Sequence, residues 1–302
     1  MTPFRVGLIG AGWISRTHLA ALARVPEGRA VAVWSRSRER ARRLAAEFGL
    51  EIATDRVDEL IAAGVGLAYA EELPFVPKFA RLRELLESGA LGEPRYAAQR
   101  EAHAGPYSPW FFTREEAGGG VLMDMACHGV ECLRWLLGKP PVDRVTAHLG
   151  RSAHAARGEL EDHAVLHLEF ATGATGLVEA SWALEGGMQS RLEVWGARGF
   201  AEADLTQATG LRVYAREAGS GGASGWSTPP ADWLWENGYP QELSHFLRCF
   251  ASGETPSESA ADGLAVLEVL YAAYVSARER RSVALPCRPR GVARAVDLWL
   301  SA

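Results

Sequence analysis

A short apolar run that ends in a glycine turn constrains the fold of this chain more than any other feature. Phe4 to Ile9 has the length of a strand, Gly10-Ala11-Gly12 follows it, and a helical stretch then runs to Arg24. Strand, tight glycine turn and helix in this order are typical of the start of a dinucleotide-binding unit. Gly10 permits the turn, and Gly12 lets the backbone approach a pyrophosphate at the positive end of the helix.

The second strand of the unit decides which dinucleotide fits. Ala30 to Trp34 is that strand, and a helix to about Phe48 follows. An acid at this place binds ribose hydroxyls, whereas a small residue beside an arginine accommodates a 2′-phosphate. Ser35 and Arg36 therefore favour NADP(H), with NAD(H) as the other possibility, unless Arg36 belongs to a solvated helix face. The predicted cofactor-binding residues are Gly10, Ala11, Gly12, Trp13, Ile14, Ser35 and Arg36.

The pattern of the chain changes near residue 92, from alternating strands and helices to longer runs of period two. Strands are expected at 164–170, 175–183, 191–196 and 211–215, and amphipathic helices at 241–253 and 262–281. Residues 219–230 are rich in glycine, serine and proline and are predicted to form a loop. The fold class is thus a shortened α/β Rossmann domain, 1–92, followed by an α+β domain, 93–302, with an open, mainly antiparallel sheet.

The stretch GGGVLMDMACHGVE, residues 118–131, combines the most flexible tripeptide of the chain with Asp124 and His128. We expect the glycines to let the backbone turn and approach a ligand, and a helix to continue through Leu137. Positions 124 and 128 would then share one helix face. An imidazole can remove a hydroxyl proton near neutral pH, and a carboxylate can orient it or bind a second hydroxyl. A helix ion pair or a two-ligand metal site would use the same spacing.

Composition excludes several classes of partner and site. The formal net charge is −5 and the arginines are scattered among acids, so nucleic acid is not an expected partner. The longest apolar stretch, Leu264 to Val275, is interrupted by Glu268 and is shorter than a bilayer span, so no membrane partner is expected. The four cysteines lack the spacing of a zinc site and nothing at the amino terminus resembles a signal peptide, which favours a reducing cytoplasm and no metal.

Three stretches of the chain form a specific combination: VGLIGAGWISRTHLAAL at the start, AGGGVLMDMACHGVECLRWLLG in the middle and the later EVWGARGF. Together they resemble the Gfo/Idh/MocA family of nicotinamide-dependent oxidoreductases. The resemblance implies a Rossmann domain joined to an open-sheet domain, and a substrate that is a sugar, cyclitol or related polyol. The family pattern G-G-G-x-L-x-D-x-x-x-H implies substrate orientation by Asp124 and proton transfer by His128. Tyr107 and Trp110 stand where members line the substrate pocket, although a buried aromatic loop would have the same sequence.

One departure from the family is large. Members carry a strand ending in T-P-x-x-x-H and another ending in E-K-P, whose lysine works beside the aspartate and histidine, and neither is found in this sequence. Two strands and two helices amount to roughly 50 residues. We expect residues 64–70 to form a fourth parallel strand beside Phe4 to Ile9, with a right-handed crossover. Glu71 and Glu72 would then stand where the family presents its lysine, for which Lys78 is a poor substitute.

The sequence thus predicts an NAD(P)-dependent oxidoreductase that moves a hydride between nicotinamide and a hydroxyl-bearing carbon. Two alternatives stay open because the E-K-P lysine is absent. The chain could be a catalytically impaired nucleotide-binding or regulatory relative, or a truncated form of an active enzyme. A homo-oligomer is expected because an open sheet would otherwise expose an apolar face to water.

Overall fold

The computed structural model describes residues 3–61, 68–106, 108–207, 213–215, 225–227 and 232–300. The chain forms two compact units, one of residues 1–76 and 232–260, the other of residues 77–231 and 261–302. This division differs from the predicted boundary at residue 92 in two ways. The segment 77–92 belongs to the second unit because its helix packs on a strand of the larger sheet. The segment 232–260 returns to the first unit because its helix covers the glycine-turn helix.

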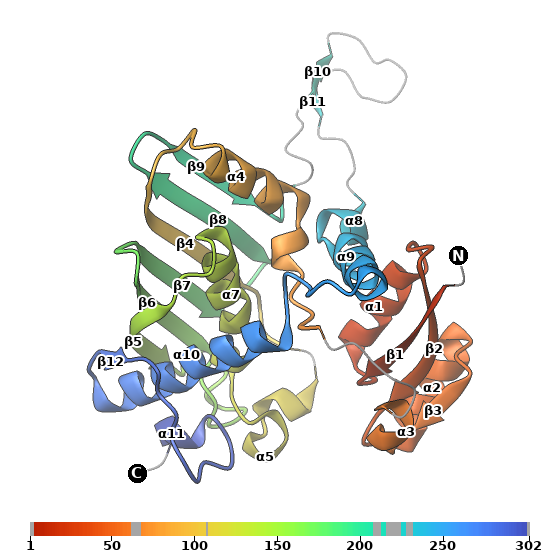
Figure 1. Cartoon of the computed structure of the whole chain (residues 1–302). Coiled ribbons are helices and arrows are strands. Elements are labelled where there is room, and N and C mark those ends of the chain that lie inside the picture. Colours follow the sequence, from red (N-terminus) through yellow and green to blue (C-terminus); the bar gives the residue numbers. More distant parts are fainter. Residues whose placement is uncertain are drawn as a thin grey trace. The chain divides into compact units, whose positions relative to one another are not determined.

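The first unit contains a three-stranded parallel sheet and the helices that flank it (Figure 1). Its strands, in the order β1-β2-β3, are β1 (Phe4–Ile9), β2 (Gly28–Trp34) and β3 (Ile52–Thr54). Its helices are α1 (Trp13–Leu22), α2 (Arg38–Phe48), α3 (Val57–Ile61), the 3-10 turn η1 (Leu73–Phe75), α8 (Trp233–Glu236) and α9 (Tyr239–Ser252). The predicted strand, glycine turn, helix and second strand are confirmed.

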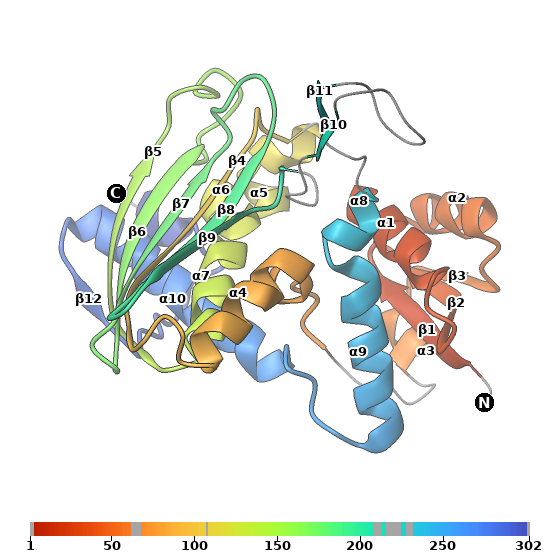
Figure 2. The same ribbon diagram turned by 90° about the horizontal axis from the view of Figure 1, so that it is seen from above.

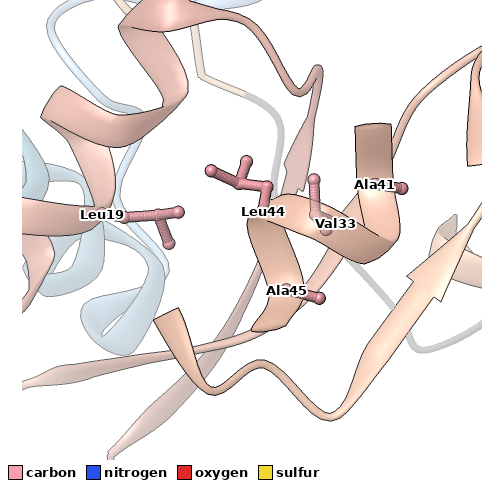
Figure 3. Close-up of a cluster of buried hydrophobic side chains, with 5 residues drawn as sticks. All are labelled: Leu19, Val33, Ala41, Leu44 and Ala45. Atoms are coloured by element: carbon pink, nitrogen blue, oxygen red, sulfur yellow. The ribbon is translucent and has the colours of Figure 1, made fainter. Parts of the chain in front are cut away.

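Apolar clusters hold these elements together, and two of them join α1 to its neighbours. Leu19 of α1, Val33 of β2 and three residues of α2 form the first, shown in Figure 3: Leu19, Val33, Ala41, Leu44 and Ala45. Leu247 of α9 packs on Leu22 and Val25 in the second. A Cβ at Gly28 would lie 2.4 Å from Leu247 Cδ1, so the absence of a side chain at 28 makes room for α9. The burial of these side chains orders α1, whose first residues follow the glycine turn.

Only residues 68–70 of the predicted fourth strand lie in the described part of the chain. Residues 64–67 lie outside the described part of the chain. For residues 68–70 the predicted pairing with β1 is wrong, because Ala68 forms an isolated antiparallel bridge with Ser259. The Tyr69 N–H donates to the Glu258 carbonyl at 3.0 Å. Within the described residues, β1 pairs with β2 alone.

The second unit is built on a seven-stranded sheet in the order β12-β5-β6-β7-β4-β8-β9. The β4–β7 pair is parallel and the other neighbours are antiparallel, which confirms a mainly antiparallel sheet. The strands are β4 (Pro94–Ala102), β5 (Val142–Gly150), β6 (His163–Phe170), β7 (Thr175–Ser181), β8 (Gln189–Gly196), β9 (Phe200–Asp204) and β12 (Val283–Ala284). A separate hairpin pairs β10 (Val213–Ala215) with β11 (Gly225–Ser227), so part of the predicted loop 219–230 is strand.

Helices cover one face of this sheet, as Figure 2 shows for α4, α7 and α10. The helical elements of the unit are α4 (Pro77–Glu87), the 3-10 turn η2 (Pro109–Phe112), α5 (Arg114–Ala117), α6 (Val121–Asp124), α7 (Ala126–Leu136), α10 (Ala260–Glu279) and α11 (Asp297–Leu300). Alternation along β4 directs Gln99 and Glu101 toward the helices and Arg100 away from them. A Cβ at Gly129 of α7 would meet Val178 at 2.5 Å and Gln99 at 2.6 Å, which shows how closely α7 lies on β4 and β7.

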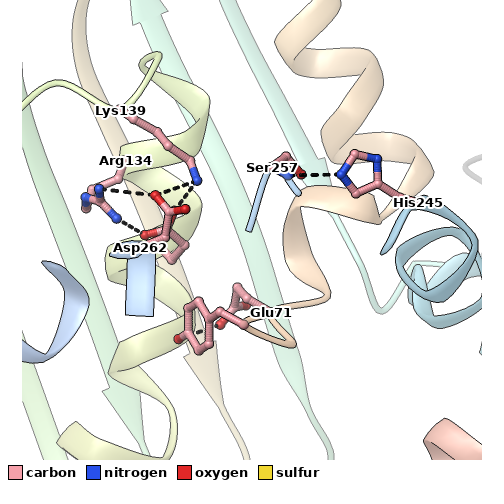
Figure 4. A network of polar contacts seen from close by, with 8 residues as sticks. Glu71, Arg134, Lys139, His245, Ser257 and Asp262 are labelled. Carbon is pink, nitrogen blue, oxygen red and sulfur yellow. Dashed lines mark hydrogen bonds and ion pairs between the residues drawn. The ribbon is translucent and has the colours of Figure 1, made fainter. Parts of the chain in front are cut away.

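An ion-pair network fixes α7 against α10 (Figure 4). Glu131 is fully buried on α7 and pairs with Arg134 and with Lys139, whose Nζ lies 3.0 Å from Oε1. Lys139 also pairs with Asp262 of α10 at 2.8 Å. A buried carboxylate needs such partners because its desolvation would otherwise be costly.

Helix α10 is long and apolar enough to cross a membrane when judged by length and composition alone. In the structure it contributes the buried residues Val266, Val269 and Tyr274 to the unit, and its Ser276 accepts a hydrogen bond from Ala147 of β5. A helix buried in the core of a protein meets the same criteria of length and composition.

Candidate functional site

The glycine turn of the first unit has the geometry of an anion-binding site. Gly10 has a φ of +126°, which favours glycine, and the Ser15 hydroxyl donates to the Gly10 carbonyl at 3.1 Å. Gly12 is the N-cap of α1, no side chain caps the helix, and nothing lies within 4 Å of a Cβ built at Gly12. The uncapped amides and the open space above Gly12 fit a pyrophosphate. Ala11 is half-buried, whereas Trp13 and Ile14 are exposed at the start of the helix.

Ser35 and Arg36 follow β2, at the same edge of the sheet. The Ser35 N–H donates to the Thr54 carbonyl at 3.0 Å, and the Ser35 hydroxyl accepts the N–H of Ser37, the N-cap of α2. Arg36 is exposed and forms no ion pair with any described residue. The guanidinium is therefore available to a ligand at the carboxyl edge of the strands, where dinucleotide riboses lie in such folds.

Asp124 and His128 come together in the second unit, although not on one helix as predicted. Asp124 is the last residue of α6, and Met125, with a φ of −124°, separates it from α7, where His128 lies in the first turn. Both side chains are half-buried, and the charge of His128 acts on Asp124. Proximity is thus confirmed, while the single continuous helix is wrong because the chain changes direction at Met125.

Trp182 is a partner of Asp124 that the sequence did not reveal. It follows β7, and its indole Nε1–H donates to Asp124 Oδ2 at 3.0 Å. Burial raises the pKa of Asp124, and the nearby His128, the Trp182 hydrogen bond and His103 partly oppose the rise. None of the described residues donates a hydrogen bond to Oδ1. That oxygen can accept a hydrogen bond from a ligand hydroxyl.

His103 is a second unforeseen member of the site. It follows β4, its N–H donates to the Ser181 carbonyl at 3.0 Å, and it therefore stands beside Trp182 on the helix-covered face. The Gly105 N–H donates to His103 Nδ1 at 2.9 Å, so the neutral ring carries its proton on Nε2. Burial lowers the pKa of His103, although Asp124 opposes this. Its place two residues before the Gly-Pro pair at 105–106 was the available sequence signal.

An aromatic row leads away from Asp124. Trp110 stacks on Phe111 with ring centroids 3.8 Å apart, and Phe111 meets Trp182 edge-on at 6.3 Å. Trp110 is half-buried, and the rings of Phe111 and Trp182 lie between it and Asp124. Its place in a substrate pocket stays a prediction. Tyr107 lies outside the described residues.

The two lysines are each bound elsewhere in the second unit. Lys78 Nζ donates to the Asp204 carbonyl at 2.9 Å and to the Gln207 carbonyl, and Lys139 belongs to the ion-pair network of α7 and α10. In the first unit, Glu71 is buried and accepts from the Tyr69 hydroxyl at 3.3 Å, and Glu72 accepts from the Tyr239 hydroxyl at 3.3 Å.

The glycines of 118–120 combine a sharp turn with close packing against other parts of the second unit. Gly118 has a φ of +74°, which confirms a sharp turn. A Cβ at Gly119 would lie 2.5 Å from the Tyr274 hydroxyl, and one at Gly120 would lie 2.1 Å from the Glu161 carbonyl oxygen. The close approach at 119 and 120 is therefore to other parts of the same unit, and the approach of a ligand to these glycines stays a prediction.

Comparisons with known protein families match both units. Residues 4–70 match the oxidoreductase family with an NAD-binding Rossmann fold, and residues 79–202 match the Gfo/Idh/MocA C-terminal domain. Myo-inositol 2-dehydrogenase from Thermotoga maritima is 30% identical over 237 residues, which cover 76% of this chain and 67% of that protein. Inositol 2-dehydrogenase from Rhizobium meliloti is 23% identical, with 93% of this chain and 99% of that protein covered.

Solved structures have the same fold. The structure of GenD2 from gentamicin A biosynthesis, in complex with NAD, has a TM-score of 0.81 at 28% identity. The match covers 94% of this chain and 97% of the GenD2 chain. Levoglucosan dehydrogenase, in complex with NADH and L-sorbose, has a TM-score of 0.80 at 20% identity. The match covers 95% of this chain and 100% of levoglucosan dehydrogenase. The alignment with the Rhizobium meliloti relative extends over 339 positions, although this chain has 302 residues. That relative therefore has residues without a counterpart here.

Proposed function

The chain belongs to the Gfo/Idh/MocA family of oxidoreductases, and we propose that it transfers a hydride between a nicotinamide dinucleotide and a hydroxyl-bearing carbon of a sugar, cyclitol or related polyol. The observation that carries the proposal is the grouping of His128, His103 and the indole of Trp182 around the carboxylate of Asp124. The uncapped amides of α1 and the open space at Gly12 supply a place for the dinucleotide.

Each polar residue of the site has a distinct part in the proposed reaction. The nicotinamide, when bound, accepts or supplies the hydride. His128 takes the hydroxyl proton as the carbon is oxidised and returns it in the reverse direction. Asp124 is held through Oδ2 by Trp182, and its Oδ1 accepts a second substrate hydroxyl, which orients the ring. His103 presents Nε2–H as a hydrogen-bond donor to the substrate.

A polyol is the substrate class that suits these groups. The site offers a carboxylate and two imidazoles, which bind neighbouring hydroxyls, beside aromatic rings that can cover the apolar face of a sugar or cyclitol. The names of the Thermotoga maritima and Rhizobium meliloti relatives, both inositol 2-dehydrogenases, support the same class.

For the cofactor, the family is NAD-binding, and we propose a preference for NADP(H) in this chain. Ser35 leaves space at the ribose, and exposed Arg36 supplies positive charge for a 2′-phosphate, where an acid would repel it. NAD(H) stays the alternative.

A second candidate function is nucleotide binding with little or no turnover. It is favoured by the engagement of Lys78 and Lys139 with carbonyl and carboxylate oxygens, which leaves neither amine for the role of the family's E-K-P lysine. An activity test therefore has to separate binding from turnover. Cofactor fluorescence titrations measure binding, and absorbance at 340 nm with a panel of cyclitols and sugars measures turnover. Binding of either dinucleotide without turnover of any polyol would favour the second candidate, and absence of binding would contradict both.

We also propose that the protein works in the cytoplasm as a homo-oligomer. None of its four cysteines forms a disulfide bond in the part of the chain that the structure describes, which suits a reducing compartment. The sheet face opposite the helices exposes Trp195 and Phe200, apolar side chains that a second copy could cover. Light scattering of the purified chain would show a single monomeric mass if the oligomer proposal is wrong.

A further inference from the structure

Glu161 is a buried acid that binds the start of helix α6. Its Oε1 accepts hydrogen bonds from the Gly120 N–H at 2.9 Å and from the Leu122 N–H at 3.2 Å. Its backbone carbonyl accepts the Val121 N–H at 2.9 Å. One residue, 41 positions from Gly120 in the sequence, thus satisfies three consecutive amides that a helix start leaves without internal partners.

Tyr274 of α10 completes this arrangement. Its hydroxyl donates to the same Oε1 at 2.7 Å, and both side chains are buried. The two glycines between them have no room for a side chain, because a Cβ at Gly119 would meet the Tyr274 hydroxyl and one at Gly120 would meet Glu161. The glycines, the acid and the tyrosine therefore form one closely fitted set, which we name the Glu161 clamp: Gly119, Gly120, Glu161 and Tyr274.

The Glu161 clamp is connected to the candidate site through the backbone. The carbonyl of Gly120 accepts the N–H of Asp124 at 3.1 Å, and α6 ends at Asp124. α6 has four residues and no side-chain cap of its own, so its position depends on what holds its first amides. A displacement of Gly120 would move the carboxylate of Asp124 relative to the indole of Trp182.

We propose that Glu161, supported by the Tyr274 hydroxyl, is a positioning residue that fixes Asp124 for substrate binding. This role rests on the proposed function, because it presumes that Asp124 binds a substrate hydroxyl. Nothing in the site requires Glu161 to touch the substrate: its Oε1 is occupied by two amides and a hydroxyl, and its Oε2 is buried. Full burial also raises the pKa of Glu161 to about 7. The surroundings of this carboxyl group therefore differ from those of a surface carboxylate.

The test compares Glu161→Ala with the conservative Glu161→Gln in the full chain. Alanine removes the acceptor, so KM for the polyol should rise and kcat fall, each by roughly tenfold, as expected when a binding group loses its orientation. Glutamine keeps Oε1 and should restore both constants to within about threefold of the parent. Tyr274→Phe, which removes one of three donors, should give an intermediate loss.

A second measurement separates this proposal from the proposed function. The indole N–H of Trp182, assigned with Trp182→Phe in nitrogen-15 spectra, reports its hydrogen bond to Asp124 without any turnover. Its resonance should shift in Glu161→Ala and stay near the parent position in Glu161→Gln, even if no polyol is oxidised. If the resonance shifts and no activity exists, the positioning stands and the proposed function fails.

The matched control is Ser276→Ala. Ser276 is buried on α10, the helix of Tyr274, and accepts a hydrogen bond from Ala147 of β5 without contacting the Glu161 clamp. It should lower stability and leave KM, kcat and the Trp182 resonance unchanged. The proposal is overturned if folded Glu161→Ala keeps the parent resonance, or if Ser276→Ala reproduces its effects.

Discussion

The indole N–H of Trp182 lies 3.0 Å from Oδ2 of Asp124 and joins two residues 58 positions apart in the sequence. The hydrogen bond connects the end of a sheet strand to the end of a four-residue helix. It holds the carboxylate in one orientation and stabilises its ionised form.

Replacing Trp182 with phenylalanine should therefore shift the pH dependence of turnover. Burial already raises the pKa of Asp124, and loss of the donor should raise it further. A rate that needs the carboxylate would then decline at a higher pH on the acid side. The measurement is kcat/KM for a polyol against pH. Trp195→Phe, which changes an exposed indole on β8, serves as the control and should leave the profile unchanged.

His128→Ala should lower kcat by roughly a hundredfold or more, as expected for loss of a general base, and leave cofactor affinity nearly unchanged. Asp124→Ala should raise KM as well as lower kcat, because this residue is assigned to substrate orientation. Steady-state rates and fluorescence titration of the cofactor measure the two effects. Normal turnover in the variant at 128 would remove His128 from the proposed mechanism.

Gly12→Ala should weaken dinucleotide binding without lowering the stability of the folded chain. Nothing lies within 4 Å of a Cβ at this position and its φ is −88°, so thermal unfolding should change little. The methyl group would occupy the space in which we place the pyrophosphate, so dinucleotide affinity should fall by tenfold or more, about 1.4 kcal/mol. Unchanged affinity would place the pyrophosphate elsewhere.

Arg36→Ala should weaken NADP(H) selectively, by about 1 to 3 kcal/mol for loss of a charge-assisted contact. NAD(H) affinity should stay nearly constant because it has no 2′-phosphate. Arg42→Ala, on the exposed side of α2, is the matched control and should affect neither cofactor. Equal losses of both cofactors on changing Arg36 would refute the preference.

The elements that the sequence predicts well are those defined by neighbouring residues. The strand Phe4–Ile9, the turn at Gly10 and the helix from Trp13 depend on local apolar pattern and glycine conformation, and each is found within a few residues of its predicted bounds. The bounds of α9 and α10 are also close to those predicted. The predicted amphipathic character is confirmed for α9 and is wrong for α10, whose apolar residues are not confined to one face.

The features that the sequence did not predict depend on contacts between residues that are far apart in the chain. The break at Met125 follows a helix start held by Glu161, and the orientation of Asp124 depends on Trp182. His103 joins the site because β4 and β7 are parallel neighbours, a pairing that no local pattern specifies. Only the tertiary arrangement could show that Gly119 packs on Tyr274 and Gly120 on Glu161.

The Glu161 clamp should make folding stability depend on pH. Burial raises the folded-state pKa of Glu161 from 4.5 to about 7, against the opposing hydrogen bonds of Tyr274 and the amides of Gly120 and Leu122. A carboxyl group whose pKa is raised by folding stabilises the folded state most below pH 4.5. That contribution is lost as pH rises through 7. The free energy of unfolding should therefore change by about 3 kcal/mol between the low-pH limit, where Glu161 is protonated in both states, and the high-pH limit, where it is ionised in both.

Denaturant unfolding of the parent and of Glu161→Gln, at pH values from 5 to 8.5, measures this dependence. Glutamine cannot ionise, so the free energy of unfolding of the variant should fall less over this range than that of the parent. The gap between the two should close, or reverse in favour of glutamine, above pH 7. Glu116→Gln, an exposed acid on α5 in the same unit, should follow the parent curve. Parallel curves for the parent and Glu161→Gln would show that Glu161 does not titrate between pH 5 and 8.5. The carboxyl group of Glu161 would then keep a single charge state across that range while it binds the amides of α6.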